Sequence, residues 1–223
     1  MLKNTGNNLI FAKITSITAP TAFLLLILLH FLKPDFDPSW RMVSEYAIGD
    51  WGWAMHITFI LFAASSFSCF FALRSKIKST TGKIGLVFLI TAAISLSFAA
   101  IFGTDPITTE IGDITLTGII HGLAAGLGMP SIPFAAGLIS IELLKNKIWK
   151  TSHWPLLVLA NIPWMSLATM GALFVVGIVR TGGAIGPEIL IGWPNRILMF
   201  GYLVWLTSIS INLIRLYKSP TTP

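Results

Sequence analysis

Six apolar segments, each about 20 residues or longer, constrain this chain more than any other feature. They lie near residues 11–32, 51–73, 84–103, 118–143, 153–179 and 194–216. A helix needs roughly 20 residues to cross the hydrocarbon core of a bilayer. The sequence therefore predicts an all-α integral membrane protein, in which residues 1–223 form a single domain of six spanning helices.

The composition excludes an ordinary soluble domain. Hydrophobic residues make up 54% of the 223 residues and charged residues only 11%, whereas soluble domains carry about 25% charged residues. The mean hydropathy is +0.79. The single cysteine, Cys69, lies in an apolar run, so the chain has neither a disulfide framework nor a cysteine metal site.

Basic residues are distributed unevenly between the two sets of segment ends. All but four of the 15 lysines and arginines fall at one set, and the exceptions are Lys33, Arg41, Arg180 and Arg196. The nine acidic residues, except Glu142, fall at the opposite set. Because positively charged loops stay in the cytoplasm, this pattern predicts cytoplasmic N and C termini. It also explains the net charge of +6 without a nucleic-acid partner.

A polar stretch separates the first two apolar segments, and we call its residues 33–50 the lid. The sequence predicts that the lid forms a short amphipathic helix across the mouth of the bundle. Asp37 suits the N-cap of this helix and Pro38 its first position. Arg41 and Glu45 are four residues apart, so they would share a helix face.

Cap and break signals define the expected helix ends. Asp50 suits the N-cap of the second spanning helix, and Thr115 or Thr117 suits that of the fourth. Pro130 and Pro133 are expected to break or kink the fourth helix inside the membrane, because proline removes a backbone hydrogen bond.

A glycine repeat marks one face of the fourth segment. Gly118, Gly122 and Gly126 recur every four residues. Such a face lets another helix backbone approach closely in a membrane. His121 lies next to this stripe.

Arg196 is the most informative charged residue. In the first turn of a helix, a cation meets the positive end of the helix dipole at a cost of about 0.3–1 kcal/mol. Charge at the edge of the hydrocarbon is also expensive. One interpretation is an anchor for an anionic head group or a carboxylate ligand. The others are a clasp between Arg196 and a carboxylate of the same membrane side, and extension of the side chain to water.

Arg41 and Glu45 also allow two interpretations. They can form a surface ion pair, which contributes only about 0.3–0.5 kcal/mol. Alternatively, Glu45 turns inward beside Ser44 and acts on a ligand.

Three histidines, His30, His56 and His121, lie near the same end of different spans. With Asp105 or Glu45 they have the residue types of a metal site, although no pair has the local spacing of a metal motif. His56 and His121 are also placed to bracket a haem. Hydrogen-bonded packing of the three rings is the simpler interpretation.

Asp105 precedes a proline, and aspartate in this position commonly closes a turn. The alternative is a catalytic pair with His121, which would need pKa values shifted by burial. In an intramembrane hydrolase or transferase, the catalytic candidates are Glu45, Asp105 and His121. The sequence has no nucleophile elbow, phosphate loop or dinucleotide-binding fingerprint.

Five short motifs occur in order along the chain. They are Arg-x-x-Ser-Glu-Tyr at 41–46, Gly-Trp-x-Met at 52–55, Thr-Asp-Pro at 104–106, Thr-Gly-x-x-His-Gly at 117–122 and Asn-Arg at 195–196. Together they resemble the uncharacterised prokaryotic membrane family called domain of unknown function 998, over essentially the whole chain. The resemblance implies six transmembrane helices in a bacterial or archaeal membrane and no known activity. That family is remotely similar to Frag1/DRAM/Sfk1 proteins, some of which are linked to lipid remodelling or lipid asymmetry.

We therefore predict a multi-pass protein of the bacterial inner membrane with a polar pocket beneath the lid. The pocket is expected to bind or handle a lipid or another amphiphile from the outer leaflet, and its predicted lining is Arg41, Glu45, His56, Asp105, His121 and Arg196. The alternatives are the intramembrane enzyme, a haem- or metal-binding protein and a small transporter. The sequence requires no cofactor, and it is compatible with a homo-oligomer.

Overall fold

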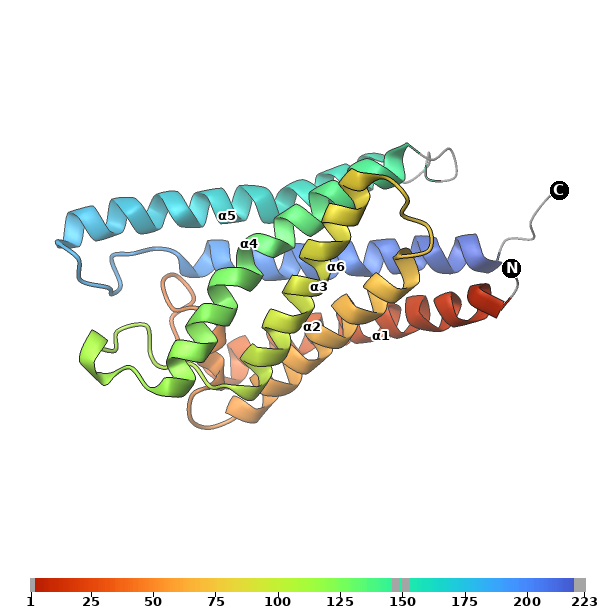
Figure 1. Cartoon of the computed structure of the whole chain (residues 1–223). Coiled ribbons are helices and arrows are strands. Elements are labelled where there is room, and N and C mark those ends of the chain that lie inside the picture. Colours follow the sequence, from red (N-terminus) through yellow and green to blue (C-terminus); the bar gives the residue numbers. More distant parts are fainter. Residues whose placement is uncertain (1–2, 146–148, 150–152, 219–223) are drawn as a thin grey trace.

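The computed structural model describes residues 3–145, 149 and 153–218, which form a bundle of six α-helices (Figure 1). All six helices are long and apolar enough to cross a membrane, and the described ranges contain no strand. The predicted all-α, six-span membrane fold is therefore confirmed. The helices are α1 (Lys3–Leu32), α2 (Gly52–Leu73), α3 (Thr80–Ile101), α4 (Leu116–Leu144), α5 (His153–Thr181) and α6 (Gly192–Lys218), and the loops hold two short 3-10 helices, η1 (Val43–Ala47) and η2 (Ile111–Asp113).

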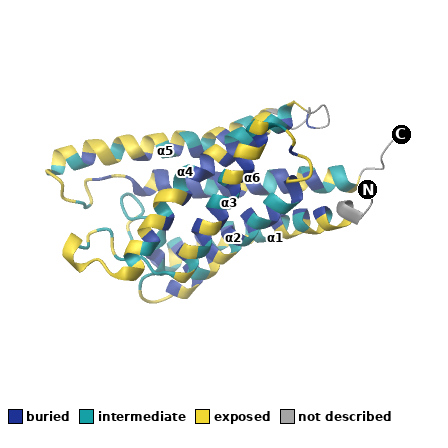
Figure 2. Ribbon diagram, in the orientation of Figure 1, coloured by how far each residue is buried: buried dark blue, intermediate teal, exposed yellow. Residues whose placement is uncertain are grey.

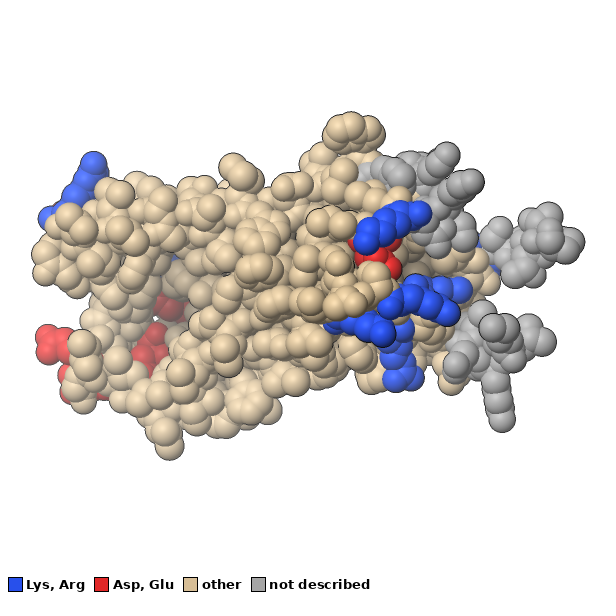
Figure 3. All heavy atoms as spheres, turned by 45° about the horizontal axis from the view of Figure 1, so that its top comes forward, with Lys and Arg blue, Asp and Glu red and all other residues tan. Residues whose placement is uncertain are grey.

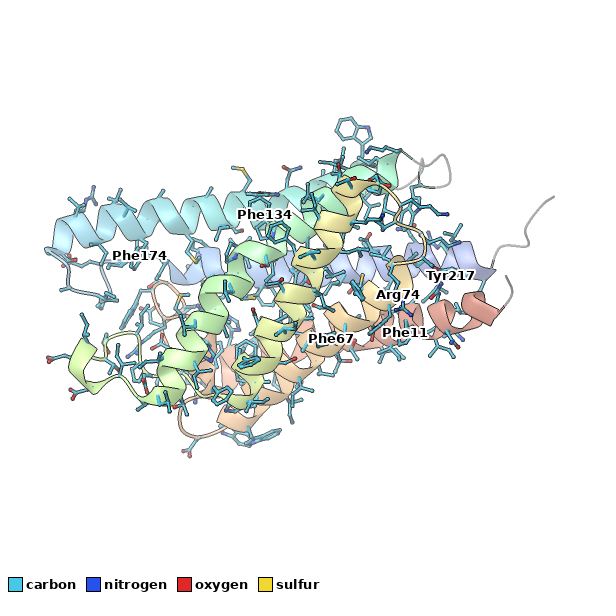
Figure 4. All side chains as sticks on the ribbon, in the orientation of Figure 1. Phe11, Phe67, Arg74, Phe134, Phe174 and Tyr217 are labelled. Carbon is cyan, nitrogen blue, oxygen red and sulfur yellow. The ribbon has the colours of Figure 1, made fainter. Side chains whose placement is uncertain are left out.

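The helices form a ring in sequence order. Each packs against the next one along the chain, and α6 closes the ring against α1. The contact between α4 and α5 includes Phe134, whose ring centroid lies 4.8 Å from that of Phe88 on α3 and 4.6 Å from that of Trp164 on α5 (Figure 4). Beyond this contact, α4 and α5 diverge toward the end of the bundle that carries the lid (Figure 1). We call this end the lid end.

Charged residues gather at the two ends of the bundle. On the face drawn in Figure 3, most lysine and arginine atoms lie at one end, and most aspartate and glutamate atoms lie at the other. The acidic end is the lid end, where a notch separates α5 from the rest of the surface. The side of the membrane that each end faces stays a prediction.

Burial differs strongly among the helices (Figure 2). In the most apolar stretch of each helix, 56% of the residues of α2 and of α6 are buried, against 17% for α5. On α6, Tyr202 and Trp205 are fully buried, and they share hydrogen bonds with Ser66 (2.9 Å) and Ser140 (3.0 Å). Helix α6 is therefore central to the packing, whereas α5 lies at the periphery.

The prediction of an α-helix starting at Pro38 in the lid is wrong. Asp37 accepts a hydrogen bond from the backbone N–H two residues later, at 2.9 Å, and closes a turn instead of capping a helix. This bond lowers the pKa of the Asp37 carboxyl. The helical part of the lid is only the 3-10 helix η1. The physical reason is that the carbonyls of Pro38 and Arg41 bond to Arg196 and are not used in an α-helical ladder.

Helix α2 starts without the predicted cap at Asp50. Its N-cap is Trp51, in the left-handed region at φ 61°, with no side-chain cap bond. The chain turns here around the buried Lys33, whose ammonium donates to backbone carbonyls of the lid, including that of Asp50 at 2.7 Å. Burial lowers the pKa of the Lys33 ammonium, and the Asp50 charge opposes that shift.

Helix α4 confirms one predicted feature and contradicts another. The Thr115 hydroxyl accepts a hydrogen bond from the backbone N–H of Gly118 at 3.0 Å, so Thr115 is the predicted N-cap. The helix then runs without a break through Pro130 and Pro133. Of the predicted break or kink, the break is therefore wrong, and the continuous helix packs along α3 over a long contact.

The glycine repeat of α4 does not receive another helix of this chain, contrary to the prediction. A Cβ atom on Gly122 or Gly126 would meet no described atom within 4 Å. The close approach of α3 occurs instead at Gly128, where a Cβ atom would lie 2.7 Å from the Cβ atom of Ser95. Gly118 faces the carboxylate of Asp105, which leaves no room for a side chain.

Candidate functional site

Arg196 of α6 is fully buried and joins three parts of the lid end. Its Nε donates to Nε2 of His30 on α1 at 2.9 Å, and its Nη2 donates to the hydroxyl of Tyr46 in η1 at 2.8 Å. Its Nη1 donates to the backbone carbonyls of Arg41 (2.6 Å), Gly192 (3.1 Å) and Pro38 (3.3 Å). We call this set of contacts the Arg196 clasp.

The Arg196 clasp holds a positive charge with neutral partners. In the described ranges, the ion pairs within 4.0 Å are Arg41–Glu45 and Glu142–Lys145, so no described carboxylate pairs with Arg196. The dipoles of backbone carbonyls compensate the charge of Arg196 in place of a carboxylate. Arg196 therefore ties the last helix to the lid, as in the clasp interpretation, but through backbone carbonyls and not through a carboxylate. Since each of its nitrogens already donates to a protein group, the guanidinium is not presented to a ligand.

His30 has a defined role in the clasp. Its Nδ1 donates to the carbonyl of Leu26 at 2.7 Å, so its Nε2 is the acceptor for Arg196. This pattern requires the neutral ring, because a protonated Nε2 has no lone pair to offer. His30 thus orients Arg196, whereas the other two candidate histidines bond to backbone carbonyls at the end of α3.

Glu45 is the second charged residue held inside the lid end, with 1% of its side chain exposed. Its Oε1 accepts hydrogen bonds from Arg41 Nη1 at 2.7 Å and from the backbone N–H of Ile107 at 2.9 Å. Its Oε2 accepts from the backbone N–H of Met42 at 2.9 Å. Glu45 therefore fastens the lid to the loop between α3 and α4, and its ion pair with Arg41 is not a surface pair.

Asp105 fastens the same loop at the start of α4. Its Oδ2 accepts a hydrogen bond from the backbone N–H of Thr115 at 2.7 Å, and its Oδ1 accepts one from the Thr115 hydroxyl at 3.0 Å. These bonds close the loop across ten residues. Both carboxylate oxygens of Asp105 therefore bond to Thr115, and Asp105 and His121 share no hydrogen bond.

His56 and His121 bind the C-terminal end of α3 from two neighbouring helices. The Nδ1 atom of His56 bonds to the carbonyl of Ala100 at 2.8 Å, and that of His121 bonds to the carbonyl of Phe102 at 2.9 Å. The last carbonyls of a helix have no partner in the helix itself. Hydrogen bonds that cap the last carbonyls of α3 therefore account for the presence of two histidines near this helix end.

A cavity lies beneath η1, between α2, α3, α4 and α6. The cavity has a volume of about 50 Å³, and one water needs about 10–15 Å³. It therefore has room for a few waters or one small polar group. Its walls are apolar apart from four uncharged polar residues, Ser44, Ser95, His121 and Asn195.

Three of these polar residues have a group without a hydrogen-bond partner among the described residues. His121 is 3% exposed and Ser95 is 7% exposed. In the part of the chain that the structure describes, neither Nε2 of His121 nor the hydroxyls of Ser95 and Ser44 make a hydrogen bond. Buried polar groups are normally paired, because an unpaired one costs about 1–3 kcal/mol. The cavity thus presents an acceptor nitrogen and two hydroxyls to whatever occupies it.

The predicted site residues do not all line this cavity. His121 alone among them lines it; Arg41, Glu45 and Arg196 hold the lid, and His56 and Asp105 fasten helix ends. Sequence reasoning missed the roles of Ser44, Ser95 and Tyr46. Ser44 and Tyr46 lie in the motif at 41–46, where consecutive side chains of a 3-10 helix point about 120° apart. Hence Ser44 reaches the cavity, Glu45 the α3–α4 loop and Tyr46 the clasp.

One known protein family matches most of this chain. The family described as "Protein of unknown function (DUF998)" matches residues 16–212. The chain belongs to this family. Searches of curated proteins and of solved structures found no match. The family confirms the resemblance drawn from the short motifs and assigns no activity, so the site of this DUF998 member has to be interpreted from its own contacts.

Metal and haem sites have little support in the geometry of this DUF998 member. No group of three or more His, Cys, Asp or Glu side chains among the described residues is arranged to hold a metal ion. The three candidate histidines have separate roles, since His30 bonds to Arg196 whereas His56 and His121 bond to α3. The cavity beside His121 is also far smaller than a porphyrin ring.

Proposed function

We propose that this membrane protein binds an uncharged amphiphile whose hydroxyl group enters the cavity beneath the lid. The observation that carries the proposal is His121, which lines the cavity with Ser95 and whose Nε2, like the Ser95 hydroxyl, has no hydrogen-bond partner among the described residues. A lipid hydroxyl can donate to His121 and accept from Ser95, which satisfies both groups. Diacylglycerols and isoprenoid alcohols have this chemistry.

The charges at the lid end favour a neutral ligand. The lining of the cavity includes no charged residue. Of the predicted pocket residues, Arg41 donates to Glu45 and Arg196 donates to backbone carbonyls. An anionic head group inside the cavity would lose its hydration without gaining a cation, which is strongly unfavourable.

The exposed glycines of α4 suit the same ligand. Gly122, Gly126 and Met129 share one face of α4, because they lie four and three residues apart. The two glycines leave open space, and Met129 both lines the cavity and packs on an apolar cluster with Met170 of α5. An apolar chain lying over the glycines would bring its hydroxyl end to the cavity past Met129.

The test is lipid binding by the purified protein in nanodiscs, with added diacylglycerol or polyprenol detected by native mass spectrometry. We expect His121→Leu to weaken binding about 10-fold, the usual effect of one lost hydrogen bond. The matched control is His56→Leu, which loses the same kind of bond to α3 but lies outside the cavity. Equal binding by the two variants, or no binding by the wild type, would refute the proposal. Conversion of the added lipid would favour the hydrolase or transferase.

A further inference from the structure

Helix α5 carries a regular stripe of exposed residues along its length. The stripe consists of Asn161, Met165, Ala168, Ala172, Val175 and Val179, all of them exposed. Their spacing alternates between four and three residues, which is the 3.5-residue repeat of two helices that pack along each other.

Asn161 places a polar amide of this stripe inside the hydrocarbon. It lies eight residues after the start of α5, or about 12 Å along the helix axis. Its Nδ2 donates to the carbonyl of Leu157 in its own helix at 2.8 Å, and its Oδ1 accepts no bond within the described ranges. A free amide oxygen facing lipid has no water to bond with at this depth.

A groove beside the stripe holds two more unsatisfied groups. The groove runs between α5 and the start of α6 and has a volume of about 590 Å³. It is lined by Asn161, Ser166 and Thr169 among apolar residues. Ser166 is only 5% exposed, and neither its hydroxyl nor that of Thr169 has a hydrogen-bond partner in the described chain. The occupant of the groove must therefore bring hydrogen-bonding groups into the membrane interior.

We propose that a second copy of this chain covers this surface, with the α5 helices of the two copies side by side and parallel. The surface is complementary to itself, because the Asn161 side chain supplies both a donor and an acceptor. A two-fold axis along the membrane normal brings the two Asn161 amides together. Small residues at Ala168 and Ala172 let the backbones approach, as small residues do in other membrane helix pairs.

The arrangement of the bundle agrees with this occupant. Helix α5 has the lowest buried fraction of the six helices, at 17%, so it has the most surface free for a partner. An ordinary phospholipid keeps its polar groups at the interface and brings none to the depth of Asn161. A parallel helix with the same stripe brings an amide at the required depth and apolar side chains at each following position.

The test is disulfide cross-linking in native membranes with one cysteine added at a time. The native Cys69 is fully buried, so an added cysteine is the accessible thiol. We expect Ala168→Cys and Ala172→Cys to form cross-linked dimers on mild oxidation. The matched control is Val87→Cys on α3, which is 61% exposed and outside the stripe; it is expected to stay monomeric.

Two variants then test the polar contact and the close approach. Asn161→Leu should lower the dimerisation constant about three- to thirty-fold, as measured for interhelical polar contacts in membranes. Ala168→Ile should lower it by blocking the approach, and its exposed position keeps the fold intact. Equal cross-linking at Val87 and Ala168 would overturn the proposal. So would a monomeric wild type that carries a lipid or quinone released by Asn161→Leu.

Discussion

The Arg196 clasp and the cavity beneath the lid lie next to each other, yet their buried polar groups differ in how completely they are hydrogen-bonded. In the clasp, each nitrogen of the buried guanidinium donates to a protein acceptor. In the cavity, Nε2 of His121 and the Ser95 hydroxyl are equally buried and have no acceptor or donor in the described chain. Charge and burial alone therefore do not mark a binding site at this end of the molecule. The completeness of the hydrogen bonding separates residues that hold the fold from residues free to meet a ligand.

The largest effect is expected from Arg196→Met. Five acceptors lose their donor, and the bonds to the Tyr46 hydroxyl and the Gly192 carbonyl are buried. Because an unpaired buried group costs about 1–3 kcal/mol, the free energy of unfolding should fall by about 3–5 kcal/mol. The measurement is denaturant unfolding in detergent micelles. Arg180→Met is the control, because Arg180 is exposed at the end of α5, and it should change the value by less than about 0.5 kcal/mol. Similar values for the two variants would mean that the clasp does not hold the lid.

Glu45→Ala is expected to have the next largest effect. It removes the acceptor for the N–H groups of Met42 and Ile107 and leaves Arg41 without its partner, which should cost about 2–4 kcal/mol. The same unfolding assay measures it. Glu110→Ala, at an exposed position of the α3–α4 loop, should be close to neutral. If Glu45→Ala is also neutral, the bonds between lid and loop contribute little to stability.

Gly192→Ala tests how closely the lid packs on α6. A Cβ atom at Gly192 would overlap the Pro38 carbonyl and lie 2.8 Å from that of Arg41. Overpacking of this kind should lower the free energy of unfolding, measured in the same assay, by about 1–3 kcal/mol. Gly186→Ala is the matched control, because a Cβ there meets no atom within 4 Å. If Gly192→Ala leaves the free energy of unfolding unchanged, the lid packs less closely on α6 than the contacts of the clasp imply.

Ser95→Ala should have the smallest effect on stability, and it sharpens the comparison most directly. Since its hydroxyl has no partner in the described chain, the free energy of unfolding should stay within about 0.5 kcal/mol or rise. Lipid binding should nevertheless weaken. Ser66→Ala is the contrast, because Ser66 shares a buried hydrogen bond with Tyr202, and it should cost about 1 kcal/mol. A loss of stability on Ser95→Ala would indicate an unrecognised partner for this hydroxyl.

Part of the lid end follows from local sequence. The spacing of Arg41 and Glu45 predicted their contact, which forms even though η1 is a 3-10 helix and not the expected α-helix. The hydroxyl of Thr115 caps α4 as its position suggested. Both contacts join residues three or four positions apart, so the geometry of one turn is enough to predict them.

The sequence by itself determined that this protein is a six-helix membrane bundle with its acidic groups at the end that carries the lid, because length, apolarity and charge are properties of each segment alone. Only the tertiary structure decided that Arg196 bonds to His30 and Tyr46 and that His121 faces a cavity. A membrane helix is apolar on its lipid side as well as on its protein side, so its sequence pattern gives little sign of which face turns inward. The partners of a buried polar group depend on that rotation and on which helices become neighbours.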